Sequence, residues 1–184
     1  MAEQCVQYVQ RSLGMTLDYA PETLPVLDHY LRLAPHESDD VRVLLAATAG
    51  AYFGEVVRAN HACRWSAPEA DYGAWRIEFE SIFLHFNPVA FAHEAVIGAE
   101  IVHGGSGFGV LDEDLGAVRS ALDTLGTIDE ADYFLLSTRY EVLVTVVERL
   151  MTFSAGSGAS PVPRYFGADA YRAALGDGSV ERPS

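Results

Sequence analysis

The chain has 184 residues, and its 12 basic and 26 acidic side chains give a formal net charge of −14. All twelve basic residues are arginine, and the absence of lysine excludes chemistry that needs a side-chain amine, such as Schiff-base catalysis. The negative charge argues against a nucleic acid as partner, because affinity for phosphate backbones comes largely from basic patches. Nearly half of the residues are hydrophobic, which provides for a sizeable core and argues against global disorder.

The first 38 residues predict short helices that prolines interrupt. Pro21, Pro25 and Pro35 bracket one short apolar run, and Pro35 predicts its end, because proline cannot continue the hydrogen-bond ladder. The segment has no apolar stretch typical of a signal peptide, and the longest uncharged run in the apolar middle of the chain is too short to cross a bilayer. We therefore expect a cytoplasmic protein without a membrane partner. The two cysteines, Cys5 and Cys63, fit a reduced compartment.

Residues 38–60 predict the central helix of the core. Ser38 fits an N-cap, and the acidic residues that follow it lie where the helix dipole favours negative charge. Inside this segment Ala46, Gly50 and Gly54 recur every four residues, which places small residues on one helix face. A stripe of this kind predicts that another element approaches the helix closely there.

Residues 62–86 predict a small antiparallel sheet. Residues 75–80 alternate between apolar and charged side chains, which is typical of a half-buried strand. The phase then changes, because the apolar side chains of residues 82–86 fall on even positions. The change predicts a bulge or bend near Ser81.

Three further helices are predicted after the sheet. An Asn-Pro pair fits an N-cap and first turn for a helix over residues 87–98. Aspartate at the start and glycine at the end delimit a second helix over residues 112–126. Thr127 and Glu130 form a capping box that predicts a longer helix over residues 127–151. Its β-branched content leaves a strand as the alternative.

The composition changes after residue 153. A run rich in serine, glycine and proline predicts a flexible linker, and residues 168–175 predict a short helix beyond it. The sequence thus predicts one globular α+β domain over residues 1–153, in which a helical bundle packs on a small antiparallel sheet. Residues 154–184 form the linker and the short C-terminal helix. The negative charge belongs to the domain, because residues 66–153 hold 15 acidic residues and 4 arginines while residues 154–184 hold three of each.

One cluster of residues suggests a metal-dependent enzyme as an alternative function. His85, His93, Glu94 and His103 fall within nineteen residues, and the adjacent pair resembles half of a zinc-binding His-Glu-x-x-His motif. The second histidine of that motif would stand at Ile97. Ordinary core or surface histidines are therefore the main interpretation, and no metal ligand is assigned.

The glycine-rich run at residues 104–109 carries no phosphate-binding pattern. A dinucleotide fingerprint that starts at Gly105 needs its third glycine where Val110 stands. A nucleophile elbow around Ser106 needs glycine where Phe108 stands. Since no catalytic motif survives these tests, we expect no cofactor and favour a non-enzymatic protein.

Two surfaces are candidates for binding a protein partner. The charged face of the predicted strand consists of Arg76, Glu78 and Glu80. An ordinary solvated surface is the alternative for these side chains. The aromatic candidates of the C-terminal segment are Tyr165, Phe166 and Tyr171. Their helix can dock on its own domain or on another chain. A further aromatic set, Trp65, Tyr72 and Trp75, is interpreted as core packing, with a binding platform as the alternative.

Three runs of sequence carry a family resemblance. They are GAYFGEVVR at residues 50–58, WRIEFESIFLHFNPVAFAHEA at residues 75–95 and DYFLLSTRYEVL at residues 132–143. Over about residues 40–151 the chain resembles an uncharacterised bacterial protein family of high-GC genomes. The resemblance implies a bacterial cytosolic α+β domain and transfers no active site.

The net charge and the missing catalytic motifs together favour an acidic interaction protein. Such a protein would bind a protein partner with a basic surface, as an immunity-like inhibitor or a secretion adaptor does. A scaffold that assembles through its C-terminal helix is a further alternative. The oligomeric state stays open at this stage.

Overall fold

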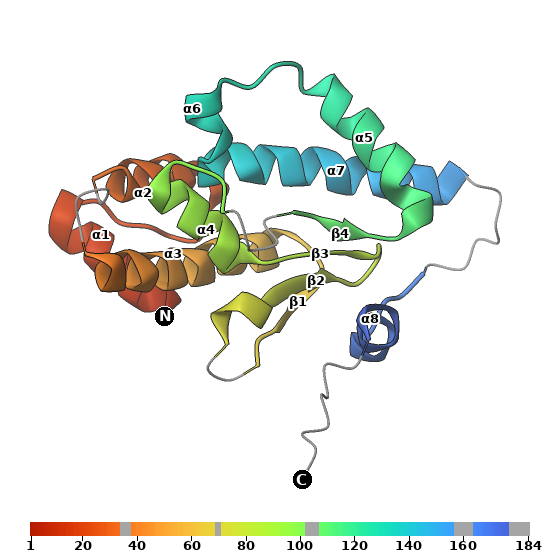
Figure 1. Cartoon of the computed structure of the whole chain (residues 1–184), viewed down its shortest axis with the longest axis horizontal. Coiled ribbons are helices and arrows are strands. Elements are labelled where there is room, and N and C mark those ends of the chain that lie inside the picture. Colours follow the sequence, from red (N-terminus) through yellow and green to blue (C-terminus); the bar gives the residue numbers. More distant parts are fainter. Residues whose placement is uncertain (34–37, 69–70, 102–106, 157–163, 177–184) are drawn as a thin grey trace, which may run out of the picture.

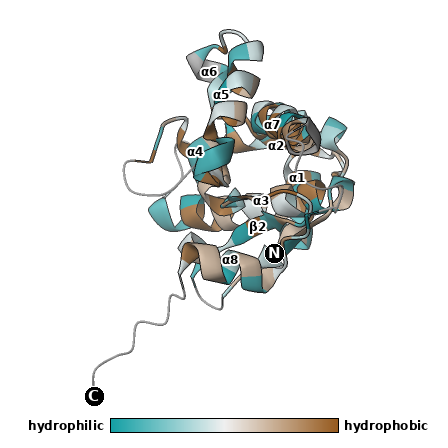
Figure 2. Cartoon of the chain, turned by 90° about the vertical axis from the view of Figure 1, so that its right-hand side faces the viewer, coloured by the Kyte–Doolittle hydropathy of each residue, from teal (hydrophilic) through white to brown (hydrophobic). Residues whose placement is uncertain are grey.

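The structure is a computed structural model that describes all residues except 34–37, 69–70, 102–106, 157–163 and 177–184. Helices pack on one face of a four-stranded antiparallel sheet, and the C-terminal helix lies against the other face (Figure 1, Figure 2). The predicted α+β class is confirmed. In the part of the chain that the structure describes, no helix is both long and apolar enough to span a membrane.

The described part of the chain contains helices of two kinds and four strands. The α-helices are α1 (Ala2–Leu13), α2 (Leu24–Leu31), α3 (Asp39–Asn60), α4 (Pro88–Ile97), α5 (Leu115–Thr124), α6 (Glu130–Tyr133), α7 (Leu136–Gly156) and α8 (Ala168–Leu175). Short 3-10 helices are η1 (Pro21–Thr23), η2 (Tyr72–Ala74) and η3 (Asp112–Asp114). The strands, in their order across the sheet, are β1 (Cys63–Ser66), β2 (Arg76–Phe79), β3 (Leu84–Phe86) and β4 (Gly109–Val110). The strand alternative for the segment before residue 151 is wrong, because that segment lies in α7.

Helix α3 runs through the centre of the molecule, and two of its glycines set how closely its neighbours pack. A Cβ atom added at Gly50 would lie 2.5 Å from the Cα atom of Val89, at the start of α4. A Cβ atom added at Gly54 would lie 2.2 Å from the indole ring of Trp65. Any side chain at either position would collide with these neighbours, so the glycines are what allow the close approach. The prediction that another element packs on the small-residue stripe is confirmed.

The sheet separates an apolar layer from a polar one. Ile77 and Phe79 of β2 are buried in the core cluster with α3. The alternate residue Glu78 pairs across the strands with Arg64 on one side and His85 on the other. Since successive side chains of a strand point to opposite faces, these three polar residues share the face that α8 covers.

A bend interrupts the sheet between β2 and β3, and the hydroxyl group of Tyr171 from α8 fills it. The Leu84 amide donates to this hydroxyl at 3.0 Å, and the hydroxyl lies 2.9 Å from the carbonyl oxygens of both Phe79 and Leu84. The Tyr171 ring stacks on Phe83, with ring centroids 4.4 Å apart. The bend predicted near Ser81 is therefore present, and Tyr171 provides hydrogen bonds to backbone groups that the bend removes from the ladder.

The C-terminal segment adds a second backbone link to the domain. The Phe166 amide donates to the Glu80 carbonyl oxygen at 2.8 Å, and Arg64 Nη1 donates to the Phe166 carbonyl oxygen at 2.8 Å. Helix α8 occupies the residues predicted for it, and within this chain it docks on its own sheet. The predicted linker begins later than expected, because α7 continues to Gly156. The rest of that linker, and the helix stop predicted at Pro35, lie outside the described residues.

The start of α7 differs from the prediction for a physical reason. The capping box at residues 127–130 predicts one continuous helix, whereas the chain forms the single turn of α6 and starts α7 at Leu136. The carboxylate of Asp28, on α2, accepts the amides of Leu136 at 2.7 Å and Ser137 at 3.0 Å. A helix cap provided from a distant element fixes this start, and local sequence does not reveal it.

Alanine at either close-packed glycine of α3 tests the packing argument. We expect Gly50→Ala and Gly54→Ala each to lower the free energy of unfolding by about 1–3 kcal/mol or more, because overpacking outweighs the better helix propensity of alanine. Gly116→Ala on α5 is the control, since a Cβ atom there meets nothing within 4 Å. Denaturant unfolding of the three variants measures the effect. Equal stabilisation by all three substitutions would contradict the argument.

Removal of the Tyr171 hydroxyl tests its role at the bend. We expect Tyr171→Phe to lower the free energy of unfolding by about 1–3 kcal/mol, because the carbonyl oxygens at the bend lose the hydroxyl as a donor in a buried site. The Leu84 amide keeps the Ile82 carbonyl oxygen as an acceptor at 3.1 Å. Tyr165→Phe is the matched control in the same segment, because that side chain is 71% exposed. Thermal or denaturant unfolding compares the two variants. An unchanged Tyr171→Phe protein would show that the hydroxyl does not stabilise the bend.

Candidate functional site

A groove of about 680 Å³ lies between the start of α1, the second half of α3 and strand β1. Three half-buried aromatic side chains contribute to its walls, namely Tyr19, Trp65 and Trp75. Among its described lining residues, the charged side chains are the carboxylates of Glu3 and Glu55. Aromatic faces and carboxylates both attract cations, so the chemistry of this groove suits a positively charged group.

The position of Trp65 follows from its contacts with α3. Its indole ring lies over Gly54, where no side chain competes for the space. Its Nε1 atom donates to Oε1 of Glu55 at 2.8 Å. The other carboxylate oxygen of Glu55 accepts from Arg58 at 2.6 Å. The indole and the carboxylate are thus held in a fixed relation along one side of the groove.

Trp75 is held in turn by its neighbours on the sheet side. Its ring meets Trp65 edge to face with centroids 5.7 Å apart, and it meets Tyr72 in the same way at 5.0 Å. Its Nε1 atom donates to the Pro68 carbonyl oxygen at 3.0 Å. Edge-to-face packing of this kind leaves ring surface available to a bound group.

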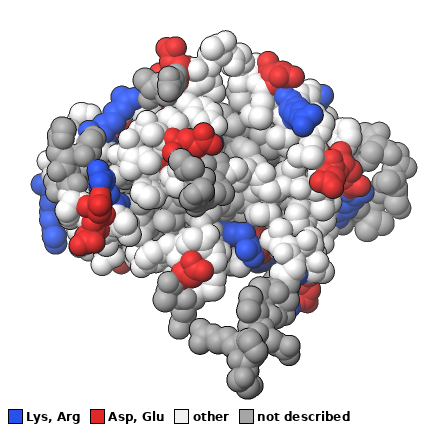
Figure 3. Space-filling view, in the orientation of Figure 1, with Lys and Arg blue, Asp and Glu red and all other residues white. Residues whose placement is uncertain are grey.

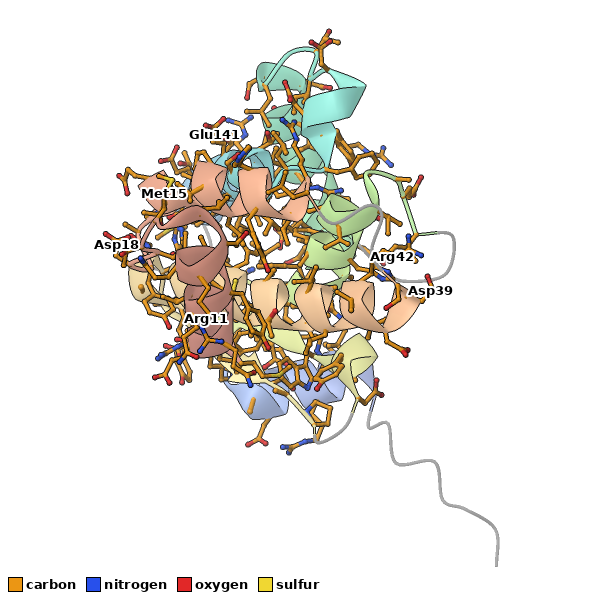
Figure 4. The ribbon with its side chains drawn as sticks, turned by 90° about the vertical axis from the view of Figure 1, so that its left-hand side faces the viewer. Arg11, Met15, Asp18, Asp39, Arg42 and Glu141 are labelled. Carbon is orange, nitrogen blue, oxygen red and sulfur yellow. The ribbon has the colours of Figure 1, made fainter. Side chains whose placement is uncertain are left out.

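Tyr19 reaches the groove through an unusual backbone conformation. Its φ angle is +65°, and it is the one residue other than glycine with positive φ among the described residues. The strain, about 1–2 kcal/mol for a residue with a Cβ atom, is offset by a hydrogen bond from its amide to the Tyr52 hydroxyl at 2.9 Å and by ring stacking on Tyr52. Asp18 precedes it in the loop after α1 and accepts the Ala20 amide at 3.0 Å (Figure 4). Strained residues are concentrated at functional sites, which supports this groove as a site.

The field of the two carboxylates reaches the Tyr19 hydroxyl. Partial burial raises the pKa of Tyr19 above its ordinary value, and the negative charges of Glu3 and Glu55 raise it further. The phenol therefore remains neutral in the physiological range. A cation that enters the groove would meet carboxylates and aromatic rings, and at Glu55 it would compete with Arg58, which pairs with that carboxylate at 2.6 Å.

The protein-binding residues predicted from sequence come together, but they serve the chain's own C-terminal helix. Glu78 is 2% exposed, with Arg64 and Arg76 at 2.9 and 3.3 Å from its carboxylate. Tyr171 is fully buried, and the Glu80 carbonyl oxygen accepts the Phe166 amide. The alternative of an ordinary solvated surface is thus wrong for Glu78, which lies under α8, whereas Arg76 and Glu80 remain half-buried. Tyr165 alone of the tail's aromatic candidates is largely exposed.

The histidine cluster suggested from sequence does not assemble in the described part of the chain. Glu94 is fully buried and pairs with Arg139 at 2.7 Å, whereas His85 lies on the α8 side of the sheet. His93 lies on α4, and His103 is outside the described residues. No group of three or more metal-ligating side chains occurs among the residues that the structure describes.

Both cysteines are free thiols in sites where burial dominates. Burial raises the pKa of Cys5 and of Cys63 to about 12. Since the thiolate is the reactive form of cysteine, neither residue is a nucleophile near neutral pH.

Charge on the visible face of the molecule is spread out. Acidic and basic side chains are interspersed there and separated by wide uncharged areas (Figure 3). Opposite charges also pair locally, as Asp39 and Arg42 do at the start of α3 (Figure 4). The net charge of −14 is therefore not gathered into one acidic patch on this face.

Comparisons with protein-family models, with curated proteins and with solved structures find no match to this chain. The resemblance to a bacterial family over about residues 40–151 therefore stays a prediction.

Two half-buried histidines make stability depend on pH. Burial lowers the pKa of His61 and His85, and for His85 the nearby charge of Arg76 lowers it further. Below about pH 6.5 the two histidines therefore bind more protons in the unfolded chain than in the folded chain. Their contribution to the free energy of unfolding is complete above that pH and is lost as the pH falls below it. We expect the free energy of unfolding to decrease from pH 7 to about pH 5.5.

Substitution of both histidines tests the source of this pH dependence. We expect the double variant His61→Gln and His85→Gln to have less than half of the wild-type slope of unfolding free energy against pH. His29→Gln, at an exposed position on α2, controls for the substitution itself. A wild-type slope in the double variant would assign the pH dependence to other groups.

Proposed function

We propose that the protein is a non-enzymatic binding protein of a bacterial cytoplasm, which recognises a basic protein partner by taking one of its cationic side chains into the groove. Immunity-like inhibitors and secretion adaptors are two forms that such a protein takes. The observation that supports the proposal is the pairing of three aromatic rings with two carboxylates along one groove.

Electrostatics supports a basic partner over an acidic or neutral one. A chain with a net charge of −14 attracts basic proteins at long range and speeds their encounter. At short range, an arginine or lysine head group over an aromatic ring gains about 0.5–2 kcal/mol. Within the chain Arg58 already pairs with Glu55, so a guest cation competes with it for that carboxylate.

The groove favours arginine over lysine as the guest. A guanidinium group is planar, so it can stack on a ring such as Trp75 while its edge donates to a carboxylate such as Glu3. An ammonium group is a compact charge that is more strongly hydrated, so its transfer from water costs more. The partner is therefore expected to present an exposed arginine.

The two tryptophans of the chain provide a direct measurement, because both line the groove. We expect an Arg-Gly-Arg-Gly-Arg amide peptide to change the tryptophan fluorescence in a saturable way at 20 mM salt. Affinity should fall at least about 10-fold by 300 mM salt, because screening weakens attraction between exposed charges. The matched peptide with citrulline in place of arginine keeps the shape without the charge, and it should not bind.

Charge removal at the groove provides the matched variants. The double variant Glu3→Gln and Glu55→Gln should lower the affinity for the arginine peptide by about 10-fold, which corresponds to about 1.4 kcal/mol of binding free energy. The amide oxygen introduced at Glu55 still accepts from the Trp65 indole, so the fold is retained. Glu141→Gln on α7, exposed and outside the groove, should bind as wild type (Figure 4). Equal binding of the citrulline peptide, or wild-type affinity in the groove variant, would overturn the proposal.

A further inference from the structure

A second cavity, which shares no lining residue with the groove, is built differently. It has a volume of about 490 Å³ and lies between α4, α5 and α7, with residues 107–108 at its edge. This volume falls in the range of small-molecule sites, about 300–1,000 Å³. Its apolar wall includes Phe91, Leu122, Leu125, Ile128, Tyr133 and Val142. One charged side chain, Arg139, lines it as well.

Arg139 is held rigidly in this apolar wall. The residue is 6% exposed, and its guanidinium carbon lies 4.6 Å from the ring centroid of Phe91 and 4.4 Å from that of Tyr133. Its Nε atom donates to the Tyr133 carbonyl oxygen at 3.0 Å, and its Nη2 atom donates to Glu94 at 2.7 Å. Among the described residues, the hydrogen bonds of Arg139 are those of Nε and Nη2. A largely buried arginine held by these contacts therefore lines an apolar cavity.

The charge around this donor decides which acceptor it suits. Glu94 is fully buried and neutralises Arg139, so the pair has no net charge. A neighbouring hollow shares Leu125, Ile128 and Val142 with the cavity wall, and its charged residues are Asp129, Asp132 and Glu141. An anion in the cavity would lose its hydration without gaining a net positive partner. A neutral hydrogen-bond acceptor loses far less hydration free energy than an anion on transfer from water to the cavity.

The arrangement is not explained by stability alone. Replacement of a buried ion pair by apolar residues of similar volume is often neutral or stabilising, so the pair is weak evidence of a structural role. An apolar cavity with one convergent polar group is instead the usual form of a small-molecule site. We propose that this cavity binds an uncharged, mainly apolar molecule with a carbonyl oxygen, which accepts a hydrogen bond from Arg139 Nη1. The proposal does not rest on the groove or on a protein partner.

The first experiment uses a fluorescent ketone as the probe. The probe is 6-propionyl-2-(dimethylamino)naphthalene, which is neutral, apolar and sensitive to the polarity of its surroundings. We expect saturable binding to the full chain with a blue-shifted emission. Leu122→Trp, which fills the cavity, should abolish this signal, whereas Leu115→Trp on the same helix should not, because Leu115 is similarly exposed but lies outside the cavity wall. Absent binding, or equal binding by both variants, would overturn the proposal.

The second experiment identifies the class of ligand by displacement of that probe. We expect 2-acetylnaphthalene to displace it and 2-naphthoate, of similar shape but charged, to be the weaker competitor. The affinity ratio of 2-acetylnaphthalene to 2-ethylnaphthalene, which lacks the acceptor, should fall by about 10-fold when Glu94→Gln and Arg139→Met are combined. Stronger displacement by 2-naphthoate would overturn the neutral class, and this comparison needs only the wild-type protein. An unchanged ratio in a folded double variant would overturn the role of Arg139.

Discussion

The close approach that Gly50 and Gly54 permit on α3 is the constraint on which the rest of the structure depends. At Gly50 the backbone of α4 comes nearer than any side chain would allow, and at Gly54 the Trp65 ring does the same. The first contact joins α3 to α4, with which it shares the core. The second contact places an indole on the wall of the groove, so the packing of the core and the chemistry of the candidate site have the same origin.

The sheet has a comparable dependence on the C-terminal helix. Its phase changes between β2 and β3, and a bend of this kind leaves backbone groups without ladder partners. The Tyr171 hydroxyl lies within hydrogen-bond distance of four of these groups, including the Leu84 amide. The sequence left open whether the C-terminal helix docks on its own domain or on another chain, and within this chain it packs on its own sheet. Of its three aromatic candidates, Tyr165 is the one largely exposed to solvent.

Sequence reasoning succeeded where the signal was local. Residues 39–60 form the predicted helix because small and apolar residues repeat with helical period and acids stand in its first turn. Asn87 caps α4 as predicted, since its side chain accepts the amides of Val89 and Ala90. It failed at α7, where the start depends on Asp28, more than one hundred residues earlier in the chain. It also left Trp65 and Trp75 as core residues with a binding platform as the alternative, and it did not find Tyr19, Glu3 or Glu55.

The sequence by itself determined the α+β class, the position of most helices and the bend after β2. Its lack of lysine also excluded Schiff-base catalysis, and its acidic composition argued against a nucleic acid partner. These properties depend on the spacing of residues along the chain and on the number of residues of each type. Only the tertiary structure decided which side chains share a site, because residues 3, 19, 55, 65 and 75 meet through the packing of α1, α3 and β1. Only the tertiary structure showed that Glu78 of β2 is buried where α8 packs on the sheet, and that Tyr171 of α8 is buried against that sheet. It also showed that Arg139 lies beside a cavity. Spacing specifies the face of an element, whereas the partner on that face is set by how the elements fit together.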